Sequence, residues 1–166
     1  MGNIRLIMEL KIVNRKGIEF TVLYSDIDHE IITNHKWYVG SDGYVRTVEK
    51  YPMLMHRILL SVEDSKIHVD HRDHNKLNNQ RDNIRTCSRS QNMANRIQSG
   101  ESKYLGVSFQ RYTMKGKYHY CNIIATIHTN GKKKFLGRHK TEEDAAKAYD
   151  QAALQIHGEF ANLNFK

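Results

Sequence analysis

The residues best suited to catalysis are Asp70 and His71, which are adjacent in the segment His68-Val69-Asp70-His71. Asn83 and Asn92 follow at offsets of 13 and 22 from Asp70. A carboxylate can bind a hard divalent cation, and an adjacent imidazole can take a proton from water. If these four side chains converge, they would suit metal-assisted cleavage of a phosphodiester bond.

The elements around these residues are expected in the order strand, polar loop, strand, helix. Residues 66–70 and 83–87 have strand patterns and flank a loop rich in Asp, Asn and Arg. Ser88 and Gln91 then form a capping box that begins a helix running to about Ile97. Asn92 would lie near the free N–H groups of that helix, a setting that favours an anionic phosphate.

The flanking sequence divides into an N-terminal part and a C-terminal part. We expect a strand-rich module at residues 1–51, a nuclease module at 52–97, a polar linker at 98–102 and a second domain at 103–166. Strands over 104–111, 120–128 and 132–139 are predicted in that domain, followed by an alanine-rich helix from Thr141 to Ile156. The chain is therefore expected to be α+β.

Charge is concentrated in the middle of the chain, and the net charge is +8. Residues 56–140 hold seventeen Lys and Arg against six Asp and Glu, whereas residues 1–55 hold seven of each. A basic surplus that overlaps the Asp/His/Asn set favours a nucleic-acid partner. No apolar run is long enough to span a membrane, and the two cysteines form no Cys-x-x-Cys pair. We expect a protein of the reducing cytoplasm of a bacterial or phage-infected cell, neither secreted nor bound to a membrane.

Residues 56–96 resemble the HNH endonucleases of the phage and homing type. The resemblance rests on His56-Arg57, Val69-Asp70-His71, residues 78–85 (NNQRDNIR) and residues 90–95 (SQNMAN). It implies a ββα-metal nuclease core that cuts double-stranded DNA. By that resemblance, His71 is the general base, Asp70 and Asn92 hold one Mg²⁺ or Mn²⁺ ion, and Asn83 is a catalytic residue that hydrogen-bonds to His71.

Two other interpretations of this segment stay open. A zinc site built from His56, His68, His71 and His74 does not follow a standard zinc spacing. The second concerns Arg57, Arg81 and Arg85, which could bind phosphate or brace the polar loop. Arg89 is expected to bind DNA.

Residues 103–165 resemble the Apetala/ethylene-response-factor type of DNA-binding domain. The resemblance rests on Tyr104-Leu105-Gly106-Val107, Leu136-Gly137, residues 141–153 (TEEDAAKAYDQAA) and residues 158–165 (GEFANLNF). It implies a three-stranded antiparallel sheet that lies in the major groove and is backed by one helix. The expected DNA face comprises Leu105, Ser108, Gln110, Arg111, Thr126, His128, Lys132, Lys133, Lys134 and Phe135. Because the Arg and Trp side chains of many plant members are absent, DNA binding is implied but not the recognised sequence.

The combined interpretation is a metal-dependent, site-specific endonuclease of the nicking or homing type. A single centre per chain would nick one strand, and a homodimer could cut both. A non-catalytic DNA-binding regulator is the main alternative. An RNA-directed protein is disfavoured, because the major groove of A-form RNA is too narrow for a sheet.

Overall fold

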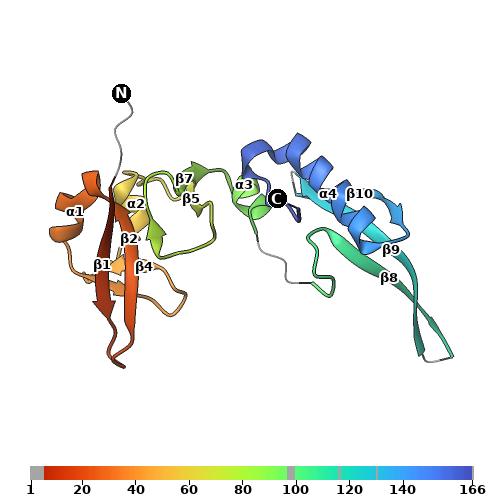
Figure 1. The fold of residues 1–166 in the computed structure, drawn as a ribbon, viewed down its shortest axis with the longest axis horizontal. Coiled ribbons are helices and arrows are strands. Elements are labelled where there is room, and N and C mark those ends of the chain that lie inside the picture. The colour runs from red at the N-terminus through yellow and green to blue at the C-terminus, as the bar shows by residue number, and fades with distance from the viewer. Residues whose placement is uncertain (1–5, 97–99, 116, 130, 166) are drawn as a thin grey trace. The chain divides into compact units, whose positions relative to one another are not determined.

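The computed structural model describes residues 6–96, 100–115, 117–129 and 131–165 as a mixed α+β protein (Figure 1). The chain divides into two compact units, Met1–Ser88 and Arg89–Lys166, and each is described below by itself. Among the described residues, no helix is both long and apolar enough to cross a membrane.

The N-terminal unit begins with an antiparallel hairpin of β1 (Ile7–Val13) and β2 (Glu19–Ser25). After β2 the chain forms the short 3-10 helix η1 (Asp26–Asp28) and α1 (His29–Thr33), then the strands β3 (Trp37–Val39) and β4 (Val45–Thr47), and then α2 (Met55–Leu59). The third strand of the first sheet is β6 (Asn78–Asn79), which pairs in parallel with β2. A segment of the polar loop thus extends the N-terminal sheet.

One hydrophobic core serves the whole N-terminal unit. Its buried members are Ile12, Val22, Tyr24, Ile32, Val45, Met55, Leu59 and Ile84. These residues come from both sides of residue 51, where we expected one domain to end and the next to begin. The boundary expected there therefore falls inside a compact unit, because both segments bury their apolar side chains against each other.

The motif strands are β5 (His68–His71) and β7 (Ile84–Cys87), which pair antiparallel. The helix that follows, α3 (Arg89–Ala94), belongs to the C-terminal unit. The order strand, loop, strand, helix is present, but the helix is shorter than expected. The expected helix end at Ile97 and part of the expected linker lie outside the described residues.

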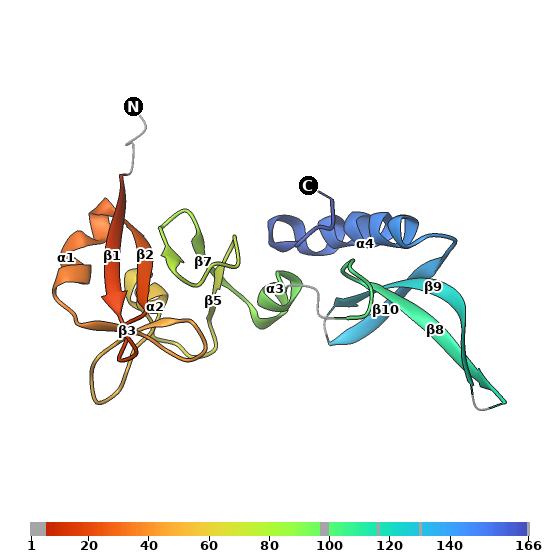
Figure 2. The same cartoon turned by 60° about the horizontal axis from the view of Figure 1, so that its bottom comes forward.

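The C-terminal unit is an antiparallel sheet in the order β10-β9-β8 with a long helix on one face (Figures 1 and 2). The elements are β8 (Val107–Met114), β9 (Lys117–Thr129), β10 (Lys132–His139), α4 (Glu142–His157) and the 3-10 helix η2 (Gly158–Phe160). Thr141 caps α4, since its Oγ1 accepts a hydrogen bond from the Asp144 N–H at 3.1 Å. Acidic residues in the first turn of α4 stabilise its positive end.

Small residues bring α4 close to the sheet. Ala145, Ala146 and Ala153 are fully buried on this helix. Gly106 lies in the left-handed region at φ +73°, and a side chain there would collide with the Tyr149 ring. Asp150 accepts hydrogen bonds from the backbone N–H groups of Asn164 and Phe165, so the C-terminal segment is held against α4.

Candidate functional site

The strand β5 ends with the two most reactive side chains of the motif. Asp70 is 8% exposed and His71 is 5% exposed. The antiparallel register places Asp70 opposite Arg85 and His71 opposite Ile84. Because neighbouring residues of a strand point to opposite faces, the two side chains have different surroundings.

His71 lies in a cluster of aromatic rings. Its ring centroid is 5.0 Å from that of His56 and 6.0 Å from that of Tyr44, and the Tyr44 and His56 centroids are 5.4 Å apart. Burial is the main cause that lowers the pKa of His71. Burial, followed by the positive charge of nearby groups, lowers the pKa of His56 to about 3. Both imidazoles are therefore neutral at neutral pH, which a proton acceptor requires.

Tyr44 and Lys76 form the outer side of this cluster. The Lys76 ammonium lies 4.5 Å from the centroid of the Tyr44 ring and donates a hydrogen bond to the Asp42 carbonyl at 2.8 Å. These contacts join the loop after β5 to the loop before β4. Sequence inspection missed Tyr44 as a neighbour of the motif, because it lies 27 positions before His71 in the chain and no local pattern links them.

Asp70 is held by an ion pair across the two motif strands. Its Oδ2 accepts hydrogen bonds from Arg85 Nε at 3.2 Å and from Nη2 at 3.0 Å. Both side chains are almost completely buried. A buried carboxylate needs such a partner, since an isolated buried charge is strongly unfavourable. Arg85 thus fixes the orientation of the proposed metal ligand.

The Asn83 carboxamide braces the polar loop. Its Nδ2 donates to Asp73 Oδ1 at 2.9 Å and to the Asn78 carbonyl at 2.7 Å, and its Oδ1 accepts from the Asp73 N–H at 3.1 Å. The Asn79 carboxamide lies next to His71, with its Oδ1 3.4 Å from Nε2 of the ring. A hydrogen bond between Asn83 and His71 stays a prediction.

Asn92 lies in α3 and is partly exposed. It belongs to the C-terminal unit, whereas Asp70 belongs to the N-terminal unit. A shared metal ion between these two side chains therefore stays a prediction.

The donor set fits a hard cation better than a closed zinc site. Within the described ranges, no group of three His, Cys, Asp or Glu side chains is suited to hold a metal ion, so the zinc alternative with His56, His68 and His74 gains no support. Mg²⁺ is commonly bound by one or two carboxylates together with water and substrate phosphate oxygens. A single anchored carboxylate such as Asp70 is compatible with that kind of site.

The arginines near the motif make contacts within the protein. Arg57 donates to the carbonyls of Ile67 and Asp64, both at 2.8 Å. Arg81 pairs with the fully buried Asp28, with Nη2 2.6 Å from Oδ1. Together with the Arg85 pair, these contacts favour the bracing role for the three side chains. Direct DNA contact by Arg57, Arg81 or Arg85 stays a prediction.

In the C-terminal unit, the strand register separates a covered face from an open one. Val107, Ala125 and Ile127 are buried in clusters that include residues of α4. The opposite face carries Ser108, Gln110, His128, Lys133 and Phe135, and also Asn122 and Arg138, which sequence inspection missed. Thr126 has the same register but is only 9% exposed, so its side chain is largely inaccessible to DNA. Leu105 is a correction to the expected DNA face, since it is only 4% exposed and packs in the core with Tyr149.

The other basic residues that the sequence analysis singled out in this unit are exposed. Lys132, Lys133 and Lys134 are exposed at the start of β10, and Phe135 is 57% exposed beside them. Arg111 is exposed after a bulge in β8 and pairs with Glu101. Arg89 begins α3 and is exposed. The open face thus combines cations, polar groups and an exposed aromatic ring.

Comparison with known proteins places the motif in a family. The family model for HNH endonucleases matches residues 61–94, which span β5, β7 and α3. An uncharacterized HNH endonuclease of Acanthamoeba polyphaga mimivirus is 36% identical over 139 residues, which cover 81% of this chain and 69% of that protein. No solved structure matches the chain.

Proposed function

Because the chain belongs to the HNH endonuclease family and is thus a DNA endonuclease, we propose that the end of β5 is its catalytic centre. The observation that carries the proposal is a neutral, buried imidazole at His71 next to the anchored carboxylate of Asp70. In this proposal, His71 takes the proton from the water that attacks the phosphodiester bond. The neighbouring rings restrict the rotation of the imidazole.

HNH endonucleases generally depend on a divalent metal ion, and we assign Asp70 and Asn92 as its protein ligands. When bound, a Mg²⁺ or Mn²⁺ ion supplies positive charge that stabilises the phosphate during cleavage. Arg85 holds the Asp70 carboxylate in a fixed orientation through the ion pair described above. Asn92 supplies an amide oxygen, a hard donor of the same class.

Two carboxamides are proposed to position His71, one by direct contact and one through the polar loop. Asn79 orients the ring through the Nε2 contact, and this contact also decides which ring nitrogen carries the proton. Asn83 acts through the loop, since its hydrogen bonds to Asp73 and Asn78 hold the chain that carries Asn79. The loss of either carboxamide should lower the cleavage rate.

The C-terminal unit is proposed to bind double-stranded DNA through the open face of its sheet, in the manner of an Apetala/ethylene-response-factor domain. Lys133 and Arg138 would contact phosphates, whereas Gln110 and His128 can reach base edges. The face is basic, polar and uncovered by α4, which supports this role. A domain of this kind would make the enzyme site-specific, as in nicking or homing endonucleases.

A plasmid nicking assay tests the catalytic proposal. Supercoiled DNA should become open-circular in the presence of Mg²⁺ or Mn²⁺, and EDTA should prevent this. His71→Ala should lower the rate by a factor of about a hundred or more, the scale of a lost general base. The matched control is His68→Ala, which changes a less buried histidine of the same strand. Its nicking rate should stay within about threefold of the parent rate, because His68 takes no part in the proposed chemistry. Equal loss in both variants would overturn the assignment of His71.

A run-off mapping experiment tests the site-specific part. Nicks mapped on a phage genome library should cluster at one sequence and on one strand. Uniformly scattered nicks would retain the endonuclease but contradict site-specific recognition by the sheet.

A further inference from the structure

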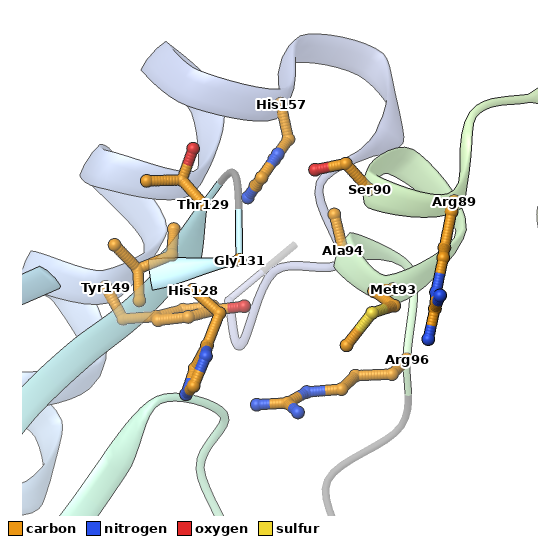
Figure 3. Close-up of a pocket in the computed structure, with 11 residues that line it drawn as sticks. Arg89, Ser90, Met93, Ala94, Arg96, His128, Thr129, Gly131, Tyr149 and His157 are labelled. Atoms are coloured by element: carbon orange, nitrogen blue, oxygen red, sulfur yellow. The ribbon is translucent and has the colours of Figure 1, made fainter. Parts of the chain in front are cut away.

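The C-terminal unit contains a cavity of about 500 Å³, and of its lining residues the roles proposed above use only His128. It lies between α3, the C-terminal half of α4 and the end of β9 with the turn that follows (Figure 3). A cavity of this size falls within the range of small-molecule binding sites.

The ionisable side chains that line this cavity are basic or phenolic. They are Arg89, Arg96, His128, His157 and Tyr149, and none of the described residues that line the cavity is acidic. Guanidinium groups stay positively charged at all physiological pH values and bind phosphate oxygens well. The electrostatic character of the cavity therefore favours an anion.

The polar groups converge on a common space, together with apolar surface. Figure 3 shows the Arg96 guanidinium, the Met93 side chain and the Tyr149 hydroxyl pointing toward the same opening, with the His157 ring above them. Arg89 lies along the outer side of α3 in this view. The Arg96 guanidinium is thus the cation best placed to meet a ligand.

The walls of the cavity are held by contacts within the unit. Tyr149 is only 5% exposed and belongs to the core, so its ring edge is a fixed wall. The Arg96 carbonyl accepts a hydrogen bond from Asn162 Nδ2 at 3.0 Å, which fixes the backbone that carries the guanidinium. His157, which is half-buried, interacts with the His128 backbone, and this contact joins the end of α4 to β9. A site with fixed walls loses little entropy on binding.

We propose that this cavity binds one nucleotide, with the phosphate at Arg96 and the base against Met93 and the edge of Tyr149. A nucleotide combines the two properties that the lining selects, an anionic group and a flat, polarisable ring. His128 adjoins both the cavity and the open sheet face, so a strand of DNA that lies on the sheet has a route to the cavity.

The nucleotide can come from two sources. One is an unpaired nucleotide of the DNA strand, and this version rests on the proposed DNA-binding role of the C-terminal unit. The other is a free mononucleotide, which requires no DNA binding at all. Both share the same chemistry, and the experiment below separates them.

Binding of fluorescent 2-aminopurine by the full chain in EDTA tests the proposal. The probes are a duplex with 2-aminopurine paired, the same duplex with it unpaired and extrahelical, and free 2-aminopurine deoxyribonucleoside monophosphate. The unpaired duplex should bind about five to ten times more tightly than the paired one, with quenched fluorescence, as stacking on a side chain predicts. Arg96→Ala and Met93→Ala should each reduce this advantage to less than about twofold.

The matched control is Lys147→Ala, which removes one positive charge from an exposed position of α4 outside the cavity. It should retain the full advantage of the unpaired duplex. Thermal unfolding of each variant checks the fold, and Arg96→Lys provides a milder change that should retain part of the binding. If the monophosphate binds and loses affinity in Arg96→Ala and Met93→Ala while the two duplexes bind equally, the free nucleotide is the ligand.

Two outcomes contradict the proposals separately. If no probe responds to Arg96→Ala or Met93→Ala in folded protein, the cavity does not bind a nucleotide. If neither duplex binds but the monophosphate does and responds to these changes, the DNA-binding role of the sheet fails while the cavity proposal stands.

Discussion

At the scale of single residues, the setting of His71 depends on side chains that no motif contains. Tyr44 touches both histidines of the ring cluster and carries the Lys76 ammonium on its other side. A mutation that removes the ring would release both the imidazole and the loop after β5. The hydroxyl takes no part in these ring contacts.

Tyr44→Leu should therefore lower the single-turnover nicking rate at saturating protein by about tenfold or more, the scale of a misplaced catalytic group. Tyr44→Phe should keep the rate within about threefold, since ring packing and the cation–π contact are retained. Affinity for DNA should stay unchanged in both. A loss of rate in Tyr44→Phe equal to that in Tyr44→Leu would show that the hydroxyl acts and that the ring is not the positioning element.

His56 makes the stability of the N-terminal unit depend on pH. Its folded-state pKa of about 3 lies below the ordinary value of 6.5, chiefly because of burial. Between about pH 6.5 and pH 3, His56 is protonated in the unfolded chain but stays neutral in the folded unit. The free energy of unfolding should therefore fall by about 1.4 kcal/mol for each pH unit below 6.5, until about pH 3. The unit should thus be more stable at pH 7 than at pH 5.

Urea unfolding at pH 7 and pH 5 measures this effect. The difference should be about 2 kcal/mol larger in the parent than in His56→Asn, which does not titrate. The variant is less stable overall, so the comparison concerns only the difference between the two pH values. Identical differences in both proteins would exclude His56 as the cause.

At the scale of elements, the ion pair of Arg81 with Asp28 joins the polar loop to the end of η1. Asp28 is fully buried and accepts three hydrogen bonds from one guanidinium. Asp28→Ala should lower the free energy of unfolding by about 3–5 kcal/mol, because it leaves Arg81 without its buried partner. Glu30→Gln, on the exposed side of α1, should change it by less than about 0.5 kcal/mol. Chemical denaturation measures both, and equal values would contradict the role of the pair.

Two glycines of the C-terminal unit separate backbone strain from steric contact. Gly106 and Gly131 both have φ +73°, but only Gly106 faces a neighbouring ring, that of Tyr149. Gly131→Ala should cost about 1–2 kcal/mol from backbone strain alone. Gly106→Ala should cost clearly more, since α4 must also move away from the sheet. Thermal unfolding of both variants measures the difference, and equal costs would contradict the close approach of Tyr149.

Sequence patterns predicted local elements better than the contacts between them. The expected strand over 132–139 agrees with β10, and the helix expected from Thr141 to Ile156 agrees with α4 to within one residue at each end. Capping residues and turn signals carry that information locally. The shared core across residue 51, the place of Tyr44 beside His71 and the contact of Asn79 with His71 all depend on tertiary packing, which no local pattern encodes.

At the scale of the whole molecule, we expect the charge distribution to determine how the affinity for DNA responds to salt. The surplus lies in residues 56–140, and the open face of the sheet carries Lys133 and Arg138. The double variant Lys133→Ala, Arg138→Ala should reduce the slope of log K against log salt concentration by about 2, one for each lost phosphate contact. Titrations at several salt concentrations measure the slope. A control that replaces Lys147 and Lys103 should leave the slope within about 0.5 of the parent value, since an exposed charge that contacts no phosphate releases no counterion.

The border between the compact units has a consequence for chimeric enzymes. The family motif spans residues 61–94, but the border falls between Ser88 and Arg89, so Asn92 is carried by the same unit as the sheet. A hybrid joined at Ser88 would exchange a proposed metal ligand together with the sheet that we propose to bind DNA. A chimera designed to retarget this nuclease should therefore keep the native α3 and replace only the sheet that follows it in the chain. The foreign sheet must then pack against the native α3.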